Sequence, residues 1–181
     1  MKRIALGLLA IGLLMTPFMA NALDLKDKDL LLYLSFNEGK GNVAKDLSKQ
    51  GNDGDLVGTV KWVDGKFGKA LEFSETGEVK APHIALNDKS FTVSLWTKPN
   101  LVGGAEQCVF SQTQVNAQNT SLHYRIYTNG TVRMGFYSND LDAPNAIKKE
   151  WTHITFWLDV KGKSRKIYIN GKQVAQDAGL A

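Results

Sequence analysis

The 181-residue sequence has little cysteine, little net charge and no long helical pattern. Cys108 is the only cysteine, so no disulfide can form within one chain. It lies in Gln107-Cys108-Val109-Phe110, a strand-like run, and we expect a buried thiol there rather than a reactive one or an intermolecular bridge. The formal net charge is only +4, and without a dense stripe of lysine and arginine it predicts no nucleic-acid partner.

The first 22 residues have the layout of a secretory signal peptide. Lys2 and Arg3 precede an apolar stretch that ends at Met19, and Ala20-Asn21-Ala22 is a small-x-small cleavage site. A membrane anchor needs about 20 apolar residues, whereas this stretch is broken by Pro17 and followed by a polar run. We expect cleavage after Ala22, no membrane span afterwards, a mature net charge of +2 without Lys2 and Arg3, and a secreted, periplasmic or extracellular location.

Beyond this segment, apolar residues alternate with polar ones in short runs, which predicts many short antiparallel strands. Leu30–Phe36 is the most apolar run and is expected to form a strand covered on both faces. Asn129-Gly130 and Asn170-Gly171 predict hairpin turns, because Asn and Gly tolerate positive φ. Meander connections of this kind indicate two packed sheets. The later expected strands cover residues 91–96, 122–127, 132–137, 151–158, 166–169 and 172–175.

Several segments together resemble the laminin-G-like, concanavalin-A-like jelly-roll domains of secreted bacterial proteins. They are residues 32–39 (Leu-Tyr-Leu-Ser-Phe-Asn-Glu-Gly), 46–54 (Asp-Leu-Ser-Lys-Gln-Gly-Asn-Asp-Gly), 65–73, 91–96, 151–154 and 167–172. They follow the family's order from about residue 30 to the end. The resemblance implies an all-β, two-sheet antiparallel jelly-roll sandwich over residues 30–181, after a polar lead-in at 23–29.

The resemblance also predicts an incomplete domain. Family members continue past the strand that holds Ile169-Asn170-Gly171 with further strands, the last of which lies close to the first. Without them, Leu30–Phe36 would keep an unpaired edge, and unpaired edges favour aggregation. We expect poor solubility or self-association, which light scattering measures.

Enzymes of this fold, notably glucanases, place Glu-x-Asp-x-Glu on one strand, and that motif is absent. Glu72, Glu75 and Glu78 are spaced by three and cross a Gly77 turn, so they would not share a strand face. Asp140-Leu141-Asp142 is expected to be a solvated loop beside Pro144. The three histidines show no metal-ligand spacing. The protein is therefore expected not to be an enzyme and to have no catalytic residues.

Calcium is the one cofactor that the sequence suggests. Asp46, Asn52, Asp53 and Asp55 concentrate oxygen donors in a Gly-rich turn, and Ca²⁺ takes six to eight oxygen ligands. Relatives in the laminin-G-like family often bind calcium through loop carboxylates, and by that resemblance Asp46 and Asn52 are the candidate ligands. The alternative is that these residues only make turns.

Strand alternation also predicts a ligand-binding face. Opposite the apolar face of residues 151–158 lie Trp151, His153, Thr155 and Trp157, and the runs at 122–127 and 132–137 similarly turn polar and aromatic side chains outward. If these strands are neighbours, one sheet presents a surface that stacks sugar rings and hydrogen-bonds them. The alternatives are that the 138–150 loop covers this face or that Trp151 is a core anchor. The candidate ligand-binding residues are Arg125, Tyr127, Tyr137, His153 and Trp157.

Three functions compete at this point. The first is a secreted, non-catalytic recognition or adhesion module that binds a glycan or an extracellular protein, with calcium for loop rigidity. The second is a structural accessory domain without a ligand of its own. The third, a polysaccharide-degrading enzyme of the same fold, is disfavoured by the missing carboxylate motif.

Overall fold

The structure is a computed structural model that describes residues 24–74, 76–101, 106–112 and 117–179. The predicted signal peptide, at residues 1–22, lies outside these ranges. Within the described part of the chain, no helix is long and apolar enough to cross a membrane. The strands are β1 (Val43–Ala44), β2 (Gly54–Val57), β3 (Val60–Asp64), β4 (Lys69–Phe73), β5 (Glu78–Lys80), β6 (Phe91–Thr97), β7 (Gln107–Gln112), β8 (Leu122–Ile126), β9 (Val132–Phe136), β10 (Asn139–Ala143), β11 (Thr152–Asp159), β12 (Ser164–Ile169) and β13 (Lys172–Asp177).

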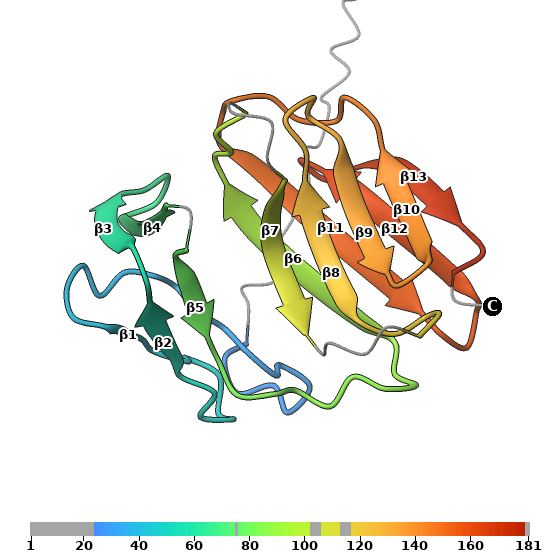
Figure 1. Ribbon diagram of the computed structural model, residues 1–181. Helices are drawn as coiled ribbons and strands as arrows, with labels where there is room; N and C mark the ends of the chain where they lie inside the picture. The colour runs from blue at the N-terminus through green and yellow to red at the C-terminus, as the bar shows by residue number, and fades with distance from the viewer. Residues whose placement is uncertain (1–23, 75, 102–105, 113–116, 180–181) are drawn as a thin grey trace, which may run out of the picture.

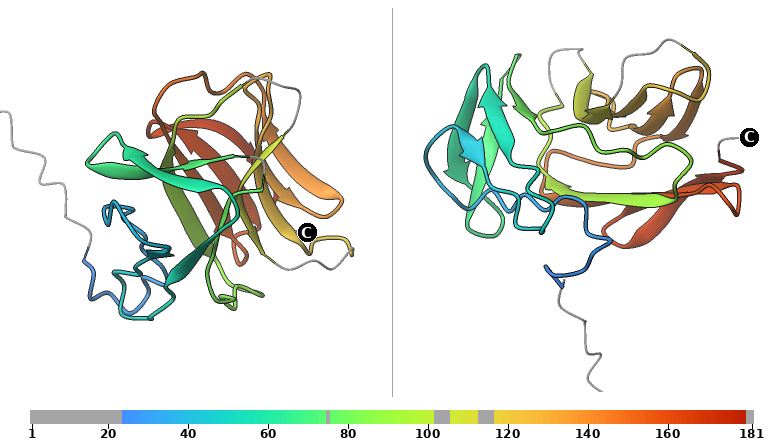
Figure 2. Two further views of the ribbon diagram at one scale, coloured as in Figure 1. Left: turned by 60° about the vertical axis from the view of Figure 1, so that its left-hand side comes forward. Right: turned by 90° about the horizontal axis from the view of Figure 1, so that it is seen from below.

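Two four-stranded antiparallel sheets form the main body (Figure 1), with strand orders β10-β9-β8-β7 and β13-β12-β11-β6. They lie face to face as two layers when seen from below (Figure 2). The three-stranded sheet β1-β2-β5 and the β3-β4 hairpin lie beside this sandwich. The prediction of an all-β, two-sheet antiparallel sandwich is confirmed.

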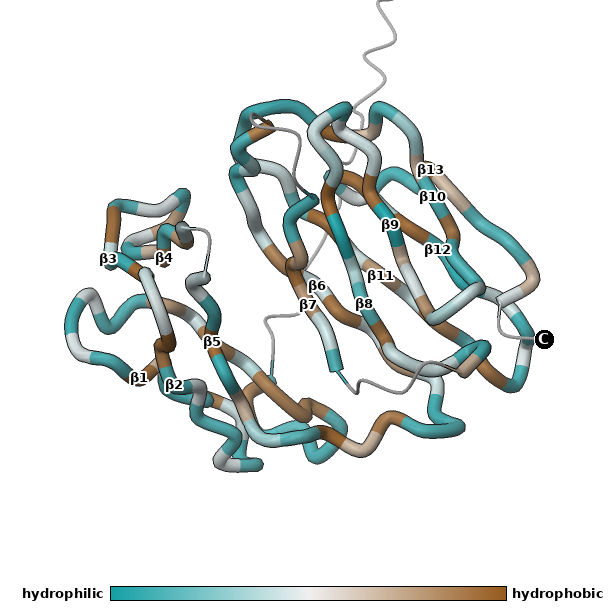
Figure 3. Tube along the Cα trace, in the orientation of Figure 1, coloured by the Kyte–Doolittle hydropathy of each residue, from teal (hydrophilic) through white to brown (hydrophobic). Residues whose placement is uncertain are grey.

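The core follows from alternation along the strands. In β11, the side chains of Thr152, Ile154, Phe156 and Leu158 are buried and those between them are half-buried. Strand β8 repeats this pattern, and Figure 3 shows apolar and polar residues alternating along the large sheets. The rings of Tyr124 (β8) and Phe156 (β11) join the two layers, with centroids 4.3 Å apart. Each fully buried side chain of this size contributes about 1.5–3 kcal/mol to folding.

The two predicted hairpins both form, with different turns. Asn170 (φ 49°) and Gly171 (φ 79°) both adopt positive φ, as a two-residue type I′ turn requires. In the β8–β9 connection, Gly130 has φ 80° but Asn129 does not have a positive φ. The Gly130 amide there donates to the Tyr127 carbonyl at 2.9 Å, which closes a longer loop with glycine in the left-handed position.

Three expectations are wrong. Leu30–Phe36 is half-buried but forms one β-bridge, between Leu34 and Asp46, rather than a strand. The segment is hydrogen-bonded instead to the 46–52 loop, through the Leu47 amide and the side chains of Asp46 and Asn52. Residues 138–150 do not form one long loop, since β10 occupies Asn139–Ala143 and pairs with β9. Cys108 lies on a strand, as expected, but it is exposed because β7 is the edge of its sheet.

Candidate functional site

The outer face of the β10-β9-β8-β7 sheet carries a cross-strand row of charged residues. Arg125 on β8 pairs in register with Arg133 on β9, and Arg133 pairs with Asp142 on β10. Two positions farther along the strands, the next row on the same face contains His123, Gly135 and Asp140. Because side chains on neighbouring positions point to opposite faces, these residues lie opposite the buried Tyr124, Ile126 and Met134. The chain thus gathers basic and acidic groups on one sheet surface.

Arg133 is the centre of this surface. Its Nε and Nη2 atoms donate to Asp142 Oδ1 and Oδ2 at 2.7 and 2.8 Å, and its Nη1 atom lies 2.8 Å from Asp140 Oδ2. Its guanidinium carbon is 5.0 Å from the ring centroid of Tyr127, which is a cation–π contact. The hydrogen bonds to Asp142, and then the charge of Asp140, raise the pKa of Arg133 against the opposing effect of burial. The guanidinium is therefore fixed in orientation and always charged.

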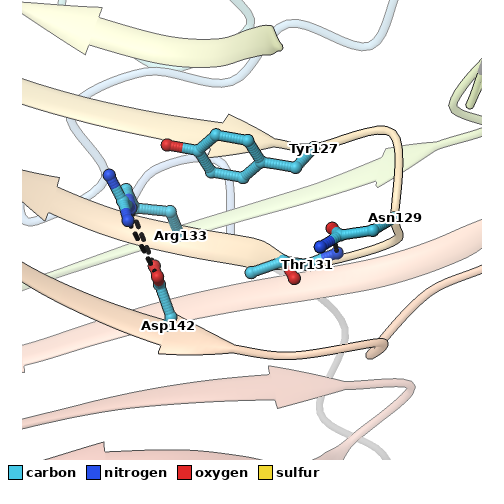
Figure 4. Close-up of a pocket in the computed structure, with 5 residues that line it drawn as sticks. All are labelled: Tyr127, Asn129, Thr131, Arg133 and Asp142. Carbon is cyan, nitrogen blue, oxygen red and sulfur yellow. Dashed lines mark hydrogen bonds and ion pairs between the residues drawn. The ribbon is translucent and has the colours of Figure 1, made fainter. Parts of the chain in front are cut away.

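A shallow hollow of about 220 Å³ opens beside this guanidinium (Figure 4). Tyr127, Asn129, Thr131, Arg133 and Asp142 line it. The Asn129 carboxamide oxygen accepts the Thr131 amide proton at 2.9 Å, which leaves the Asn129 amino group to donate. Burial, opposed by the charge of Arg133, raises the pKa of Tyr127, so its hydroxyl stays protonated at neutral pH. The hollow thus combines donors, acceptors and one aromatic ring.

Two further groups lie on the same sheet face, in register with β9. Arg125 forms an ion pair with Glu106, just before β7. Its Nε atom is buried and has no hydrogen-bond partner among the described residues. His123 lies over Gly135, where any Cβ would collide with the imidazole. The His123 Nδ1 atom is 2.7 Å from the Ser121 carbonyl and the Nε2 atom is 3.4 Å from Asp140 Oδ1.

The five predicted ligand-binding residues do not share one face. Arg125 and Tyr127 lie on the β8–β9 surface, and Tyr137 lies in the β9–β10 turn of the same sheet, 40% exposed. His153 and Trp157 are on β11, which pairs with β6 and β12 in the other sheet. Their side chains face outward on the opposite side of the sandwich. The single continuous surface expected from the sequence is therefore not formed, while the ligand-binding role of each residue stays a prediction.

Sequence reasoning missed the acidic half of the site. Asp140 and Asp142 are not solvated loop carboxylates, because β10 turns both toward Arg133. The signal was present, since Asp140-Leu141-Asp142-Ala143 alternates and Leu141 and Ala143 are buried. Glu72 and Glu78 lie on β4 and β5, strands of different sheets, so they do not share a face.

The predicted metal residues serve the chain itself. Asp46 Oδ1 accepts the amide protons of Tyr33 and Ser48, both at 2.9 Å, and Oδ2 accepts the Ser48 hydroxyl at 2.7 Å and the Asn52 amide at 2.8 Å. The Asn52 side chain donates to the Leu31 carbonyl at 2.9 Å. Four donors fill the acceptor sites of the Asp46 carboxylate. These contacts attach residues 31–34 to the loop, and calcium binding by Asp46 and Asn52 stays a prediction. The described residues hold no group of three His, Cys, Asp or Glu side chains able to bind a metal.

Comparisons with solved structures give the same fold at low sequence identity. One similar structure is domain 4 of the extracellular arabinanase AbnA from Geobacillus stearothermophilus, in complex with arabinotriose. The alignment covers 81% of this chain and 73% of the AbnA chain, at 22% sequence identity and a TM-score of 0.61. The binding domain of Paraclostridial Mosquitocidal Protein 1 matches 85% of this chain but 41% of its own, at 21% identity and a TM-score of 0.63. For a fragment of an S-layer domain-containing protein from Clostridium thermocellum, the alignment covers 83% of this chain and 73% of the fragment, at 22% sequence identity and a TM-score of 0.52.

No curated protein matches the sequence. Residues 73–181 match the family Laminin_G_3, described as the concanavalin A-like lectin/glucanases superfamily. This match covers more than half of the chain and includes β6 to β13, the two sheets of the sandwich. The protein therefore belongs to the Laminin_G_3 family of concanavalin A-like domains.

Proposed function

We propose that this protein is a non-catalytic carbohydrate-recognition domain that acts outside the cytoplasm. Its ligand lies in the hollow on the outer face of β8, β9 and β10. The observation that carries the proposal is the fixed arrangement of Arg133, between the carboxylates of Asp140 and Asp142 and against the ring of Tyr127. Such a group presents rigid donors and acceptors beside an aromatic ring.

Sugars suit this chemistry better than other small ligands. Each ring offers neighbouring hydroxyl groups that both donate and accept, so Arg133 and Asn129 can donate to them while Asp142 accepts. The apolar face of a sugar ring packs against an aromatic side chain such as Tyr127. The hollow, about 220 Å³, accommodates a sugar unit rather than a protein epitope. The arabinotriose in the arabinanase domain is a ligand of this class on the same fold.

The same geometry opposes catalysis. A glycosidase places two carboxyl groups on either side of the bond that it cleaves. Asp140 and Asp142 lie on one face of β10, but the guanidinium of Arg133 forms ion pairs with both and lies between them. We expect no release of reducing sugar from plant or bacterial polysaccharides after prolonged incubation. Release that Asp142→Asn abolishes would overturn the non-catalytic assignment.

Glycan binding is tested on the whole protein with arabinotriose and a glycan array as probes. We expect Tyr127→Ala to weaken binding about tenfold, the effect of losing one stacked ring. Arg133→Lys keeps the charge but cannot hold both aspartates, and should weaken binding similarly. Gln176→Ala, an exposed change on the other sheet, is the matched control and should bind like the wild type. If Tyr127→Ala and Arg133→Lys bind as tightly as the wild type, or no glycan binds, the proposal fails and a structural accessory role is favoured.

A further inference from the structure

The opposite side of the sandwich carries a second group of exposed aromatic residues. Trp96 on β6 is 42% exposed and Phe67, in the β3–β4 turn, is 65% exposed. Their ring centroids are 5.5 Å apart in an edge-to-face arrangement. The Lys66 ammonium lies 4.6 Å from the Trp96 ring centroid and 5.4 Å from that of Phe67. A cation and an apolar surface are thus held together at one edge of the β13-β12-β11-β6 sheet.

His153 extends this group onto β11. It pairs in register with Trp96, and the two ring centroids are 5.1 Å apart. The His153 Nε2 atom is 2.8 Å from the Ser94 hydroxyl, which is 3.4 Å from the Thr155 hydroxyl. Burial lowers the pKa of His153, so the ring is neutral at pH 7 and offers one donor and one acceptor.

A second tryptophan–lysine pair lies farther along the same face. The Lys166 ammonium on β12 is 4.9 Å from the ring centroid of Trp157 on β11. Trp157 pairs with Thr92, four positions before Trp96 on β6, so the two tryptophans are separated by about 13 Å along the strands. Ser94, Thr155 and Tyr168 lie between them in one cross-strand row. The face therefore repeats one unit, a tryptophan with a lysine, with hydroxyl groups between the two copies.

The charge on this face is positive. Neither Lys66 nor Lys166 forms an ion pair within the described ranges. Along β6, β11 and β12, the only carboxylate is Asp159 at the end of β11, where it accepts hydrogen bonds from Ser90 and Gly162. The two ammonium groups are consequently available to an anionic ligand.

We propose that the outer face of β6, β11 and β12 is a second binding site, for an anionic polysaccharide built from uronic acids. Two sugar rings contact Trp96 and Trp157, their carboxylates pair with Lys66 and Lys166, and the hydroxyl row binds the ring between. A repeating polymer fits two similar tryptophan–lysine pairs better than an irregular protein surface does. A lysine that rests on an exposed ring can turn toward a carboxylate, because the charge-assisted hydrogen bond is the stronger contact. Since this site and the Tyr127 hollow are on opposite sheets, one domain would bridge two glycan chains.

Affinity electrophoresis of the whole protein in gels that contain polygalacturonate tests this site. We expect retardation of the wild type, and a weakening of about tenfold for Trp96→Ala and for Trp157→Ala. Lys66→Gln and Lys166→Gln are conservative enough to keep the fold and should weaken binding and reduce its salt dependence. Lys172→Gln removes the same charge from β13, away from both tryptophans, and should bind polygalacturonate like the wild type.

Polyglutamate, an anionic polymer without sugar rings, serves as the second probe and should bind much more weakly. Equal binding of polyglutamate and polygalacturonate would overturn the assignment to a sugar and favour an acidic protein partner. An effect of Lys172→Gln as large as that of Lys166→Gln would show that only net charge matters, and would also overturn it. Loss of arabinotriose binding in Tyr127→Ala is independent of these results, so the two sites can fail separately.

Discussion

Arg165 on β12 forms a bidentate ion pair with Asp177 on β13, with Nε–Oδ1 at 2.8 Å and Nη2–Oδ2 at 2.7 Å. The same guanidinium donates to the carbonyl and side-chain oxygens of Asn139 at 2.9 and 2.6 Å. Because Asn139 begins β10, one side chain ties the two sheets of the sandwich together. Arg165 is 1% exposed, so water cannot solvate its positive charge. The hydrogen bonds to Asp177 and Asn139 must therefore compensate for the lost solvation.

We expect Asp177→Ala to lower the free energy of unfolding by about 3 kcal/mol, because it leaves a buried guanidinium without its counter-charge. This is the low end for such losses, since Asp177 is 36% exposed and Arg165 keeps its bonds to Asn139. Urea denaturation measures the change, with Gln176→Ala on the same strand as the control. A midpoint equal to that of the wild type would show that Asn139 alone satisfies Arg165.

Acid should destabilise the protein through Asp46. Burial alone would raise the pKa of this carboxyl, but hydrogen bonds from Tyr33, Ser48 and Asn52 outweigh it and hold the pKa below its usual 3.8. A group with a lowered folded-state pKa adds stability above its unfolded-state pKa and loses it as the pH falls through the folded-state value. We therefore expect the urea midpoint to fall below about pH 4. Asp46→Asn should lower stability at pH 7 and flatten this dependence; an unchanged slope would contradict the assignment.

Much of the fold could be predicted from the sequence because the alternation of apolar residues is local. The buried and outward faces of β8, β9 and β11 are those that the pattern predicts, and the Asn170-Gly171 turn has the expected positive φ values. The family resemblance was also confirmed by the match to residues 73–181.

The pairing of distant strands could not be predicted in this way. Alternation assigns His153 and Trp157 to an outward face but not to a sheet, and β11 pairs with β6, more than fifty residues earlier, instead of with β9. Asp140 and Asp142 resembled a loop because aspartate is rare in strands, yet Arg133 neutralises both across β9 and β10. Leu30–Phe36 looked like a strand, but it has only the Leu34–Asp46 bridge, and its Tyr33 amide donates to the Asp46 carboxylate instead of to a partner strand.

The calcium prediction can be tested by thermal unfolding with and without the ion. A ligand at 100 times its dissociation constant stabilises a protein by about 2.7 kcal/mol, which is a readily measured rise in Tm. The four donors around Asp46 point their positive ends at the carboxylate, so we expect millimolar calcium to leave the Tm unchanged. A rise that Asn52→Ala removes would establish the site. EDTA-treated protein is the control for calcium carried through purification.

Cys108 should react rapidly in the folded protein. It is exposed on the edge strand β7, and its sulfur makes one weak contact, 3.6 Å from the Phe110 carbonyl oxygen. We expect a thiol reagent to modify native protein nearly as fast as unfolded protein, and mild oxidation to give a disulfide-linked dimer on a non-reducing gel. Cys108→Ser should give neither product and should melt at the same temperature as the wild type, since no core contact is lost. Labelling that requires denaturant would instead show that this edge of the sheet is covered in solution.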